Sequence, residues 1–369
     1  METFSVVELR GSFFDIGHQH GTHFKDQISY SLECLDRTAD IRHSKEAGEI
    51  VQKCQNYAKK YASELVEEIR GIAAGSKIDF DRVFALNCYS ELWYAHDLRK
   101  RQNMNDEGCT TLAVAQKCTK GKDVYLAWNC DFYNYWEDSV ILLKIFPSNR
   151  HPFLMFTYAG VVGANAGMNP NFGLVVNGIP SKGRKWGVPY SFICRKVLQQ
   201  STIGYGLEAI LSADRSTGSS KHFLLTDKEG EICSVETSDK DFDVMYADKG
   251  FIGHTNNYVS LKMKLNGVEV KGASQTFIRL GRINRLLRDS AGMVDLIRIK
   301  EFLSDHVNYP YAICRHTQKE EERSHMPDFA DFLGDNSKTI ASFIFAIQEQ
   351  KAYVAKGNPC VGSYTEYKL

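Results

Sequence analysis

The chain has 369 residues, and its 45 lysines and arginines balance its 45 aspartates and glutamates. With 43% hydrophobic and 24% charged residues, it has the composition of a folded protein, which excludes the disordered, collagen-like and low-complexity classes. The zero formal charge and the lack of a large basic block argue against a nucleic-acid partner, because such binding depends on Lys and Arg displacing counterions.

The N-terminal segment and the cysteines bear on the compartment in which the protein acts. Glu2 and the lack of a long apolar core predict no signal peptide, and no segment approaches the roughly 18 apolar residues of a membrane span. The ten cysteines include no CxxC pair, so we expect thiols in a reducing compartment, most of them in the core. We expect a cytoplasmic protein without a membrane partner. The alternative is peroxisomal import, because Tyr367-Lys368-Leu369 shares its last two residues with a peroxisomal signal.

The first quarter of the chain, up to residue 96, is predicted to be helical. Apolar residues recur at three- and four-residue spacings across residues 51–72, which predicts one amphipathic helix. Gly75 suits the C-cap of this helix, and Asp79 suits the N-cap of the next one.

Residues 97–108 lose the apolar periodicity and contain almost no core-forming side chains. This composition predicts an exposed linker. The basic triplet Arg99-Lys100-Arg101 lies within it, and we expect these side chains to be solvated rather than to form a binding patch.

Past Gly108 the sequence changes to short runs of β-branched and aromatic residues separated by turn residues, which predict strands. The runs cover residues 110–117, 123–129, 138–147, 152–158, 172–177, 221–226, 231–237 and 339–347. Two helical segments interrupt them. One begins after Pro189 and runs from Tyr190 to Gln200, and the other carries Phe277, Leu280, Ile283 and Leu287. Strands and helices in separate runs predict an α+β fold.

The junction between the helical and strand regions reads Asn105-Asp106-Glu107-Gly108-Cys109-Thr110-Thr111. A cysteine at the start of a strand, preceded by glycine, suits a self-cleaving N-terminal nucleophile, because its thiolate can attack the carbonyl of the preceding residue. Gly108 leaves that carbonyl without a neighbouring side chain. Cleavage would free the α-amino group of Cys109, which can act as a general base. The alternative is an ordinary buried cysteine in the core.

Three further segments carry polar residues that could take part in the chemistry. Asp131 ends the next run of strand residues, in Trp128-Asn129-Cys130-Asp131-Phe132. Asn256 lies in the polar run His254-Thr255-Asn256-Asn257-Tyr258, and Arg315 follows the apolar residues of 311–314.

Together with Gly108-Cys109-Thr110-Thr111, these segments resemble the isopenicillin N acyltransferase family. Its members are cysteine N-terminal nucleophile hydrolases, and this chain is closest in character to the β-alanyl-dopamine and carcinine hydrolases. The similarity runs over nearly the whole chain. It includes Arg10-Gly11-Ser12, Gly17-His18-Gln19-His20-Gly21, residues 71–75, Ala85-Leu86-Asn87, residues 159–163, Gly167-Met168-Asn169 and Gly357-Asn358-Pro359-Cys360.

The resemblance implies a role for each of the four polar candidates. Cys109 would be the nucleophile, and Asp131 would bind the freed α-amino group. Asn256 would donate into the oxyanion hole, and Arg315 would lie near the thiolate and the carboxylate. Each role is chemically sensible, because an amide aimed at a developing oxyanion lowers the barrier and an arginine keeps its charge when buried. A structural ion pair between Asp131 and Arg315 is the alternative, and both interpretations can hold together.

The resemblance also implies a fold and a division of the chain. The fold is a four-layer αββα sandwich of the N-terminal nucleophile hydrolase type, with two antiparallel sheets covered by helices. Residues 1–108 would be a helical α chain that stays associated after cleavage. Residues 109–369 would be the catalytic β chain, with Cys109 at its new N-terminus.

The implied activity is hydrolysis of a small amide through an acyl-thioester on Cys109, with β-alanyl conjugates of dopamine or histamine as the expected substrates. One alternative is an N-acyltransferase that takes its acyl group from a coenzyme A thioester. Another is a non-catalytic binding protein, but the complete set of four candidate residues argues against it. Asn257 and Tyr258 stand where some relatives carry His, so local substrate contacts are expected to differ.

Other candidates are weaker. Phe132, Tyr133 and Trp136 follow Asp131 and could wall an aromatic substrate pocket, although aromatic residues at strand spacing are more often core. We expect no cofactor and no metal. His18, His20 and His23 have no fourth ligand nearby in the sequence and are expected to be exposed on a helix.

Overall fold

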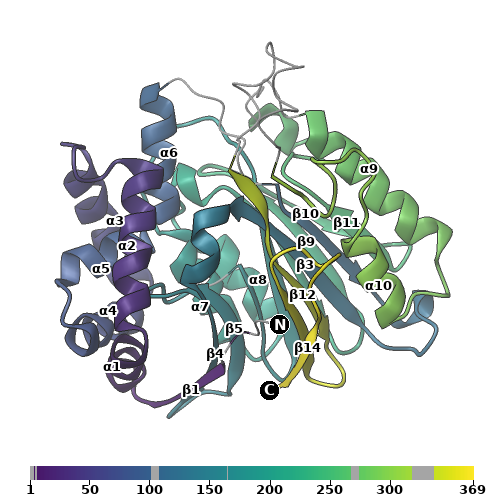
Figure 1. The fold of residues 1–369 in the computed structure, drawn as a ribbon, viewed down its shortest axis with the longest axis horizontal. Coiled ribbons are helices and arrows are strands. Elements are labelled where there is room, and N and C mark those ends of the chain that lie inside the picture. The colour runs from purple at the N-terminus through teal and green to yellow at the C-terminus, as the bar shows by residue number, and fades with distance from the viewer. Residues whose placement is uncertain (1–3, 5, 101–107, 164, 267–273, 318–335) are drawn as a thin grey trace.

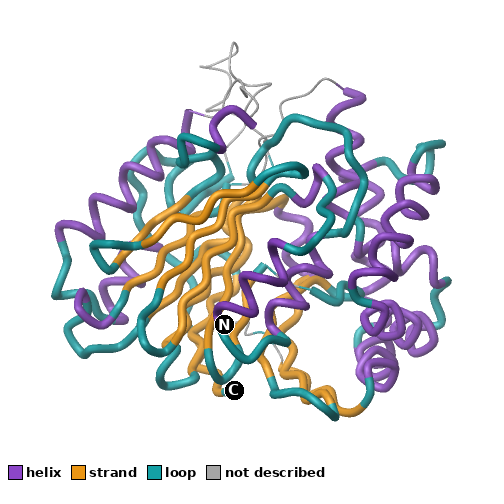
Figure 2. The backbone as a smooth tube through the Cα atoms, turned by 180° about the vertical axis from the view of Figure 1, so that it is seen from behind, coloured by secondary structure: helices purple, strands orange, loops and turns teal. Residues whose placement is uncertain are grey.

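The computed structural model describes residues 4, 6–100, 108–163, 165–266, 274–317 and 336–369 (Figure 1). Two β-sheets lie face to face between two layers of helices, as the view from behind also shows (Figure 2). Two helices pack on the first sheet, α7 (Tyr190–Leu198) and α8 (Ile203–Leu211). Two others pack on the second, α9 (Ser274–Asp289) and α10 (Leu296–Leu303). The predicted α+β, four-layer αββα sandwich is confirmed.

The first sheet has eight strands among the described residues, in the order β1-β4-β5-β6-β7-β8-β9-β10. Their bounds are β1 (Val6–Gly11), β4 (Val140–Pro147), β5 (Phe153–Tyr158), β6 (Ala166–Met168), β7 (Phe172–Gly178), β8 (Lys221–Asp227), β9 (Ile232–Thr237) and β10 (Phe242–Tyr246). Strand β1 pairs parallel with β4, so the expectation of a purely antiparallel sheet is wrong at this edge. The N-terminal region therefore adds an edge strand to a sheet built from residues that follow Cys109.

The second sheet is antiparallel, with the order β11-β2-β3-β12-β13-β14. Its strands are β2 (Thr110–Val114), β3 (Tyr125–Tyr133), β11 (Phe251–His254), β12 (Ser337–Ala346), β13 (Lys351–Lys356) and β14 (Thr365–Lys368). All eight predicted strands exist. Strands β1, β6, β10, β11, β13 and β14 were not predicted.

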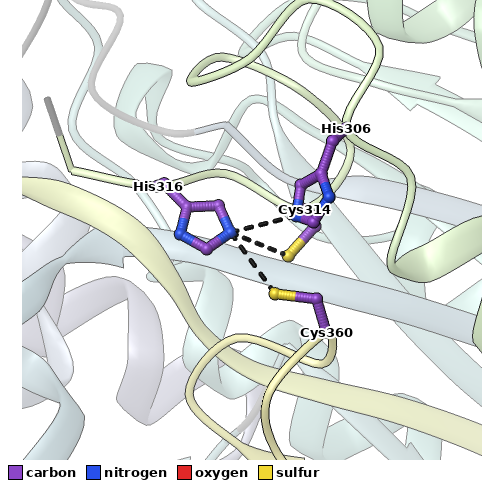
Figure 3. A group of neighbouring side chains, drawn as sticks. All are labelled: His306, Cys314, His316 and Cys360. Carbon is purple, nitrogen blue, oxygen red and sulfur yellow. Dashed lines mark hydrogen bonds between the residues drawn. The ribbon is translucent and has the colours of Figure 1, made fainter.

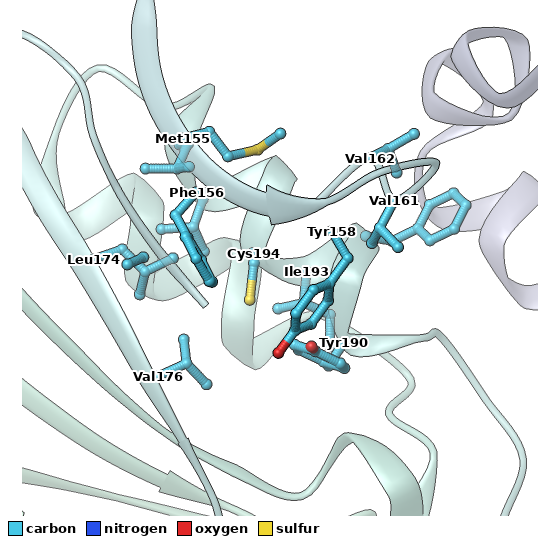
Figure 4. Packing of buried hydrophobic residues seen from close by; sticks show 14 of the residues in the cluster. Met155, Phe156, Tyr158, Val161, Val162, Leu174, Val176, Tyr190, Ile193 and Cys194 are labelled. Atoms are coloured by element: carbon cyan, nitrogen blue, oxygen red, sulfur yellow. The ribbon is translucent and has the colours of Figure 1, made fainter. Parts of the chain in front are cut away.

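Aromatic residues fill the space between the sheets. Phe156 of β5 lies edge-on to Phe343 of β12, with ring centroids 4.7 Å apart, and to Trp128 of β3, 5.4 Å apart. All three are at most 1% exposed. The other face of the first sheet packs on α7, where Ile193 and Cys194 lie near the residues of β5 and β7 (Figure 4). Alternate residues of a strand point to opposite faces of its sheet, so the first sheet contributes apolar side chains both toward the second sheet and toward α7.

The region before Gly108 was predicted to be helical, and its described residues form six helices in addition to β1. They are α1 (Phe13–His23), α2 (Lys25–Ala39), α3 (Ala47–Tyr61), α4 (Ser63–Ser76), α5 (Phe80–Asn87) and α6 (Tyr89–Lys100). Short 3-10 helices cover Gln116–Cys118, Asn134–Ser139, Thr217–Ser219 and Met263–Asn266. No described helix is both long and apolar enough to cross a lipid bilayer.

The structure corrects three expectations in this region. The single helix predicted across residues 51–72 is two helices, because the chain leaves the helical conformation at Ala62 (φ −155°, ψ 73°). Gly75 lies inside α4, and Lys77 in the left-handed conformation caps that helix instead. Asp79 does cap α5, since its side chain accepts hydrogen bonds from the amides of Asp81 and Arg82.

The third correction concerns the predicted linker at 97–108. Helix α6 continues to Lys100, so the prediction is wrong for residues 97–100. Residues 101–107 lie outside the described residues, and Gly108 is buried. The end of the linker is therefore packed inside the protein, against the second sheet.

Glycines let α1 and α4 cross with their backbones in contact. A Cβ on Gly17 would overlap the carbonyl oxygen of Glu68, and one on Gly71 would overlap that of Phe14. This close approach gives a physical reason for glycines in two of the sequence motifs, residues 17–21 and 71–75.

Candidate active site

Cys109 directly precedes β2, which lies between β11 and β3 in the second sheet. The pairing of Thr110 with Asn129 sets Gly108 opposite Asp131 when the register is continued, and the amide of Gly108 donates a hydrogen bond to the carbonyl of Asp131 (3.4 Å). The predicted cleavage point and the predicted aspartate are therefore cross-strand neighbours. This proximity follows from the antiparallel register.

Asn256 approaches Cys109 from the other side of β2. Strand β11 pairs His254 with Thr111, and this register continues to set Asn256 opposite Cys109. The guanidinium of Arg279, on α9, joins the two residues. It donates to the carbonyl of Cys109 (2.7 Å) and to Oδ1 of Asn256 (3.0 Å).

Residue 108 is enclosed by the side chains of Arg315 and Asp131. A Cβ on Gly108 would lie 2.6 Å from Nη1 of Arg315 and 2.8 Å from Oδ2 of Asp131. Both distances are shorter than a Cβ contact can be, so only glycine fits at this position without rearrangement. The structure thus brings Gly108, Cys109, Asp131 and Arg315 together in one buried place.

Asp131 is fully buried, and its carboxylate is only half satisfied by hydrogen bonds. Oδ1 accepts from the hydroxyl of Thr339 (2.6 Å), whereas Oδ2 has no hydrogen-bond partner among the described residues. Burial raises the pKa of Asp131 to about 7, although Arg279, Thr339 and Arg315 act in the opposite direction. Oδ2 is the oxygen that faces Gly108.

Arg315 is held by its backbone rather than by its side chain. Its amide donates to the hydroxyl of Thr339 (2.9 Å), and its carbonyl accepts from the amide of Thr339 (2.9 Å) and from Asn358 (2.7 Å). Its guanidinium is 1% exposed and makes no hydrogen bond within the described part of the chain. The positive charge of Arg315 therefore acts on Asp131 without a hydrogen-bonded ion pair between them.

A small cavity borders Cys109. Its described lining combines aromatic faces with a few polar groups: Tyr89, Cys109, Cys130, Asp131, Phe132, Tyr158, Asn165, Val176, Gly178 and Lys221. The thiol of Cys109 is 3.8 Å from the carbonyl of Asp131. The side-chain amide of Asn256 donates to the carbonyl of Gly178 (3.0 Å), so it lies at the edge of the cavity.

A family model described as acyl-coenzyme A:6-aminopenicillanic acid acyl-transferase matches residues 118–360, more than half of the chain. The chain belongs to this family. The resemblance seen in the motifs is confirmed, as is the prediction of an amide-cleaving or acyl-transferring enzyme. The acyl-coenzyme A:6-aminopenicillanic-acid-acyltransferase 40 kDa form of Emericella nidulans is 24% identical over 365 residues, covering 96% of this chain and 92% of that protein.

Two solved structures show a weaker likeness to this chain. A mutant of the conjugated bile acid hydrolase from Clostridium perfringens has a TM-score of 0.44 and 15% identity, covering 71% of this chain and 97% of that chain. The Caenorhabditis elegans ortholog of N-acylethanolamine-hydrolyzing acid amidase has a TM-score of 0.44 and 15% identity, covering 65% and 93%. The four-layer fold is established by the sheets and helices themselves.

Of the three aromatic residues predicted to contact the substrate, one lines the described cavity and two do not. Phe132 lines the cavity. Tyr133 stacks on Tyr135, and Trp136 is fully buried with its indole nitrogen bonded to the hydroxyl of Thr38 (3.0 Å). Neither Tyr133 nor Trp136 is part of the described cavity lining, and their substrate contacts stay a prediction.

Sequence reasoning missed Arg279, Thr339 and Lys221. Arg279 had a readable signal, because it occupies the buried face of α9 with Thr276 and Ile283, where an apolar residue is expected. An arginine in such a position needs buried partners. Thr339 and Lys221 carried no such signal, since both lie within predicted strands and reach the site only through sheet pairing.

The three N-terminal histidines of this family member form no cluster. His18 and His23 are exposed on α1, as expected. The expectation is wrong for His20, which is fully buried and accepts a hydrogen bond from the amide of Gly160 (3.0 Å). It faces inward because residues 16, 17, 20 and 21 form the buried side of the helix.

Proposed function

We propose that this protein is a self-processing cysteine amidohydrolase whose nucleophile, Cys109, is freed by cleavage of the Gly108–Cys109 bond. The observation that carries the proposal is the unpartnered Oδ2 of buried Asp131, which faces Gly108. A buried carboxylate oxygen without a partner costs free energy. An α-amino group released at Cys109 would supply the missing donor.

Self-cleavage would proceed through an acyl shift. The sulfur of Cys109 attacks the carbonyl carbon of Gly108, the carbon–nitrogen bond breaks, and the nitrogen takes the proton that the thiol gave up. The product is a thioester between Gly108 and Cys109. Water hydrolyses this thioester, which leaves a carboxylate on Gly108 and a free thiol and amine on Cys109.

Substrate turnover would repeat the same chemistry on an external amide. The sulfur attacks the substrate carbonyl while the α-amino group of Cys109 takes the thiol proton and passes it to the leaving amine. Asn256 would stabilise the oxyanion with the second hydrogen of its amide, because the first is bonded to Gly178. Water then hydrolyses the acyl-thioester and releases a carboxylate.

We propose that residues 1–108 and 109–369 become two chains that stay together. Strand β1 is hydrogen-bonded to β4 along its whole length, and the N-terminal helices pack on the body of the protein. Cleavage breaks none of these contacts.

For the substrate, we propose β-alanyl conjugates of dopamine or histamine. The faces of Tyr89, Phe132 and Tyr158 would hold an aromatic amine by stacking or an ammonium by cation–π attraction. Lys221 lines the same cavity and would repel an ammonium. The β-alanyl group would therefore lie against the aromatic faces, away from Lys221.

The test compares β-alanyl-dopamine with N-acetyl-dopamine, which has the same scissile amide and leaving amine but no ammonium. We expect kcat/KM to be about tenfold higher for the β-alanyl compound, which corresponds to about 1.4 kcal/mol and lies within the range of a buried cation–π contact. Cys109→Ala is the inactive control. A preference for the acetyl compound would contradict the β-alanyl assignment. A preference for an acyl group that carries a carboxylate would also contradict it, and would point to Lys221 as the group that recognises the acyl end.

A second candidate is acyl transfer from a coenzyme A thioester to an amine. The family description and the name of the Emericella nidulans protein favour it. An amine would then attack the acyl-thioester on Cys109 in place of water. Amide formation that outpaces hydrolysis when a coenzyme A thioester and dopamine are supplied together would select this function.

A further inference from the structure

Four side chains with metal-binding atoms meet beside the segment that carries Arg315 (Figure 3). His306, Cys314 and His316 belong to the segment between α10 and β12, and Cys360 belongs to the loop between β13 and β14. Their four ligand atoms all lie within 4.8 Å of one another. We propose that these residues form a structural zinc site, which nothing in the proposed catalytic chemistry uses.

The distances fit a tetrahedron around one ion. Nε2 of His316 lies 3.1 Å from Nε2 of His306, 3.5 Å from Sγ of Cys314 and 3.4 Å from Sγ of Cys360. Zinc–nitrogen bonds of about 2.0 to 2.1 Å and zinc–sulfur bonds of about 2.3 Å place tetrahedral ligand atoms roughly 3.3 to 3.8 Å apart. Three of the edges therefore match a His₂Cys₂ site to within a few tenths of an ångström.

Hydrogen bonding does not account for this convergence. Three ligand atoms approach Nε2 of His316, whereas a ring nitrogen carries either one hydrogen or one lone pair. Nε2 of His306 is among them, and two facing imidazole nitrogens can share a single proton at most. A cation at the centre gives all four atoms a common partner.

Surrounding contacts support two of the ligands. The side-chain amide of Asn358 donates a hydrogen bond to Sγ of Cys314 (3.4 Å). Such a bond stabilises the negative charge of a thiolate ligand. The amides of Cys314 and His316 are bonded to the carbonyls of Asp305 (3.0 Å) and Pro310 (2.9 Å). These bonds hold in place the backbone that carries both side chains.

The donor set indicates zinc in a structural role. Two thiolates and two neutral imidazoles balance the charge of Zn²⁺, and four protein ligands leave no open position for a substrate. Cys314 is buried, whereas His306 is exposed and the other two ligands are half-buried, so an ion can enter from solvent.

The site also has a consequence for the active site, which rests on the proposed function. Arg315 lies between two ligands, Cys314 and His316, and Asn358 bonds to both Cys314 and the carbonyl of Arg315. A zinc ion would fix this segment and with it the guanidinium beside Gly108. Arg315 would then be oriented for self-cleavage by a metal outside the catalytic cavity.

The experiment measures metal bound to the full chain after expression with zinc and exhaustive dialysis. We expect one zinc ion per chain in the wild type and in the Cys233→Ser control, which changes a buried cysteine of β9. Cys314→Ser and Cys360→Ser should bind zinc at least about tenfold more weakly, and Asn358→Ala roughly 10- to 100-fold more weakly. Cobalt(II) added to the zinc-free wild type should give the visible absorption of a tetrahedral thiolate site.

Three results would overturn the site without touching the proposed function. In the first, the wild type holds no zinc and gives no tetrahedral cobalt spectrum. In the second, Cys314→Ser binds zinc as tightly as the wild type does. In the third, unreduced peptides contain a disulfide between Cys314 and Cys360. The cobalt measurement needs only the wild-type chain, so it decides the matter even if a variant fails to fold.

The positioning role has its own readout. The fraction of chain cleaved at Gly108–Cys109, measured by intact mass, should fall in Cys360→Ser relative to Cys233→Ser, and added zinc should restore it in zinc-starved wild type. Equal cleavage with and without zinc would contradict the link to Arg315. Absence of cleavage in every sample, including zinc-loaded wild type, would instead contradict the proposed function. The measured zinc content would then still decide whether the zinc site exists.

Discussion

At the scale of single residues, Arg279 joins the two sides of the site. Its guanidinium binds the carbonyl of Cys109 and Oδ1 of Asn256, which turns the amide nitrogen of Asn256 toward the cavity edge at Gly178. Burial lowers the pKa of Arg279 to about 10, so it stays protonated at neutral pH. A fixed amide of this kind can stabilise an oxyanion without reorganising during the reaction.

Replacing Asn256 by alanine should lower kcat by roughly a hundredfold or more, because the amide is needed when negative charge develops on the substrate oxygen. The matched control is Asn257→Ala, whose side chain accepts hydrogen bonds from Thr255 and Thr276 and makes none to Cys109 in the structure. Steady-state kinetics and thermal melts of both variants give the comparison. A large loss for Asn257→Ala with Asn256→Ala unchanged would show that the other asparagine donates to the oxyanion.

Asp131 makes a pH-dependent contribution to stability in the uncleaved chain. Its folded-state pKa of about 7 lies above its ordinary value of 3.8, so the folded protein keeps a proton that the unfolded chain has lost. Stability is therefore lost as pH rises from about 4 through about 7, and the loss is complete above that range.

Asp131→Asn removes this dependence, because the amide cannot ionise. In a Cys109→Ala background, where cleavage is blocked, the melting temperature of the double variant should rise relative to that of Cys109→Ala as the pH is raised from about 5 to about 8. The melting temperature of the double variant could instead fall relative to that of Cys109→Ala as the pH rises. That result would mean that Arg279 and Arg315 stabilise the ionised carboxylate more than burial disfavours it.

At the scale of elements, the crossing of α1 and α4 depends on glycines. Gly17→Ala should destabilise the protein by about 1 to 3 kcal/mol, because its Cβ would overlap a backbone carbonyl that cannot move freely. Gly48→Ala in α3 is the matched control, since nothing lies within 4 Å of its Cβ position, and it should stabilise by roughly 0.5 to 1 kcal/mol. Denaturant unfolding of both variants measures the difference. Equal effects would mean that the helices do not pack through Gly17.

Elements were predictable from the sequence where local pattern alone determines them. The central strands have β-branched and aromatic runs, and Asp79 begins its helix with its own side-chain cap. The break at Ala62 was not predictable, because apolar residues continue at helical spacing through it, from Ala58 to Leu65. Strand β1 is an edge strand whose partner, β4, lies far away in the sequence, and β14 is an edge strand of only four residues.

The parts of the site that depend on contacts between distant segments were likewise not predictable from the sequence. Cys109 and Asp131 stand out in the sequence because the residue patterns place them at the ends of strand runs, although β3 continues past Asp131 to Tyr133. The register then makes Gly108 and Asp131 cross-strand neighbours. Arg279 and Lys221 enter from elements that are remote in sequence, and no local pattern indicates which part of the site they reach. The proposed zinc ligands likewise come from two loops that meet only in the folded chain.

At the scale of the whole molecule, the described residues before Cys109 are packed into the fold. Among the described residues they supply β1 to the first sheet and six helices, which lie together on one side of the molecule (Figure 1). Their last residue, Gly108, is buried between Arg315 and Asp131. A cut after Gly108 would therefore separate two chains that remain one globular unit under native conditions.

The intact mass of the purified protein under denaturing, reducing conditions decides whether Cys109 becomes a free N-terminus. We expect wild type to give chains of 108 and 261 residues that elute together on native size exclusion, and Cys109→Ala to give one chain of 369 residues. A wild-type protein that stays uncleaved and still hydrolyses amides would contradict the central claim, because Cys109 would then have no free α-amino group with which to act.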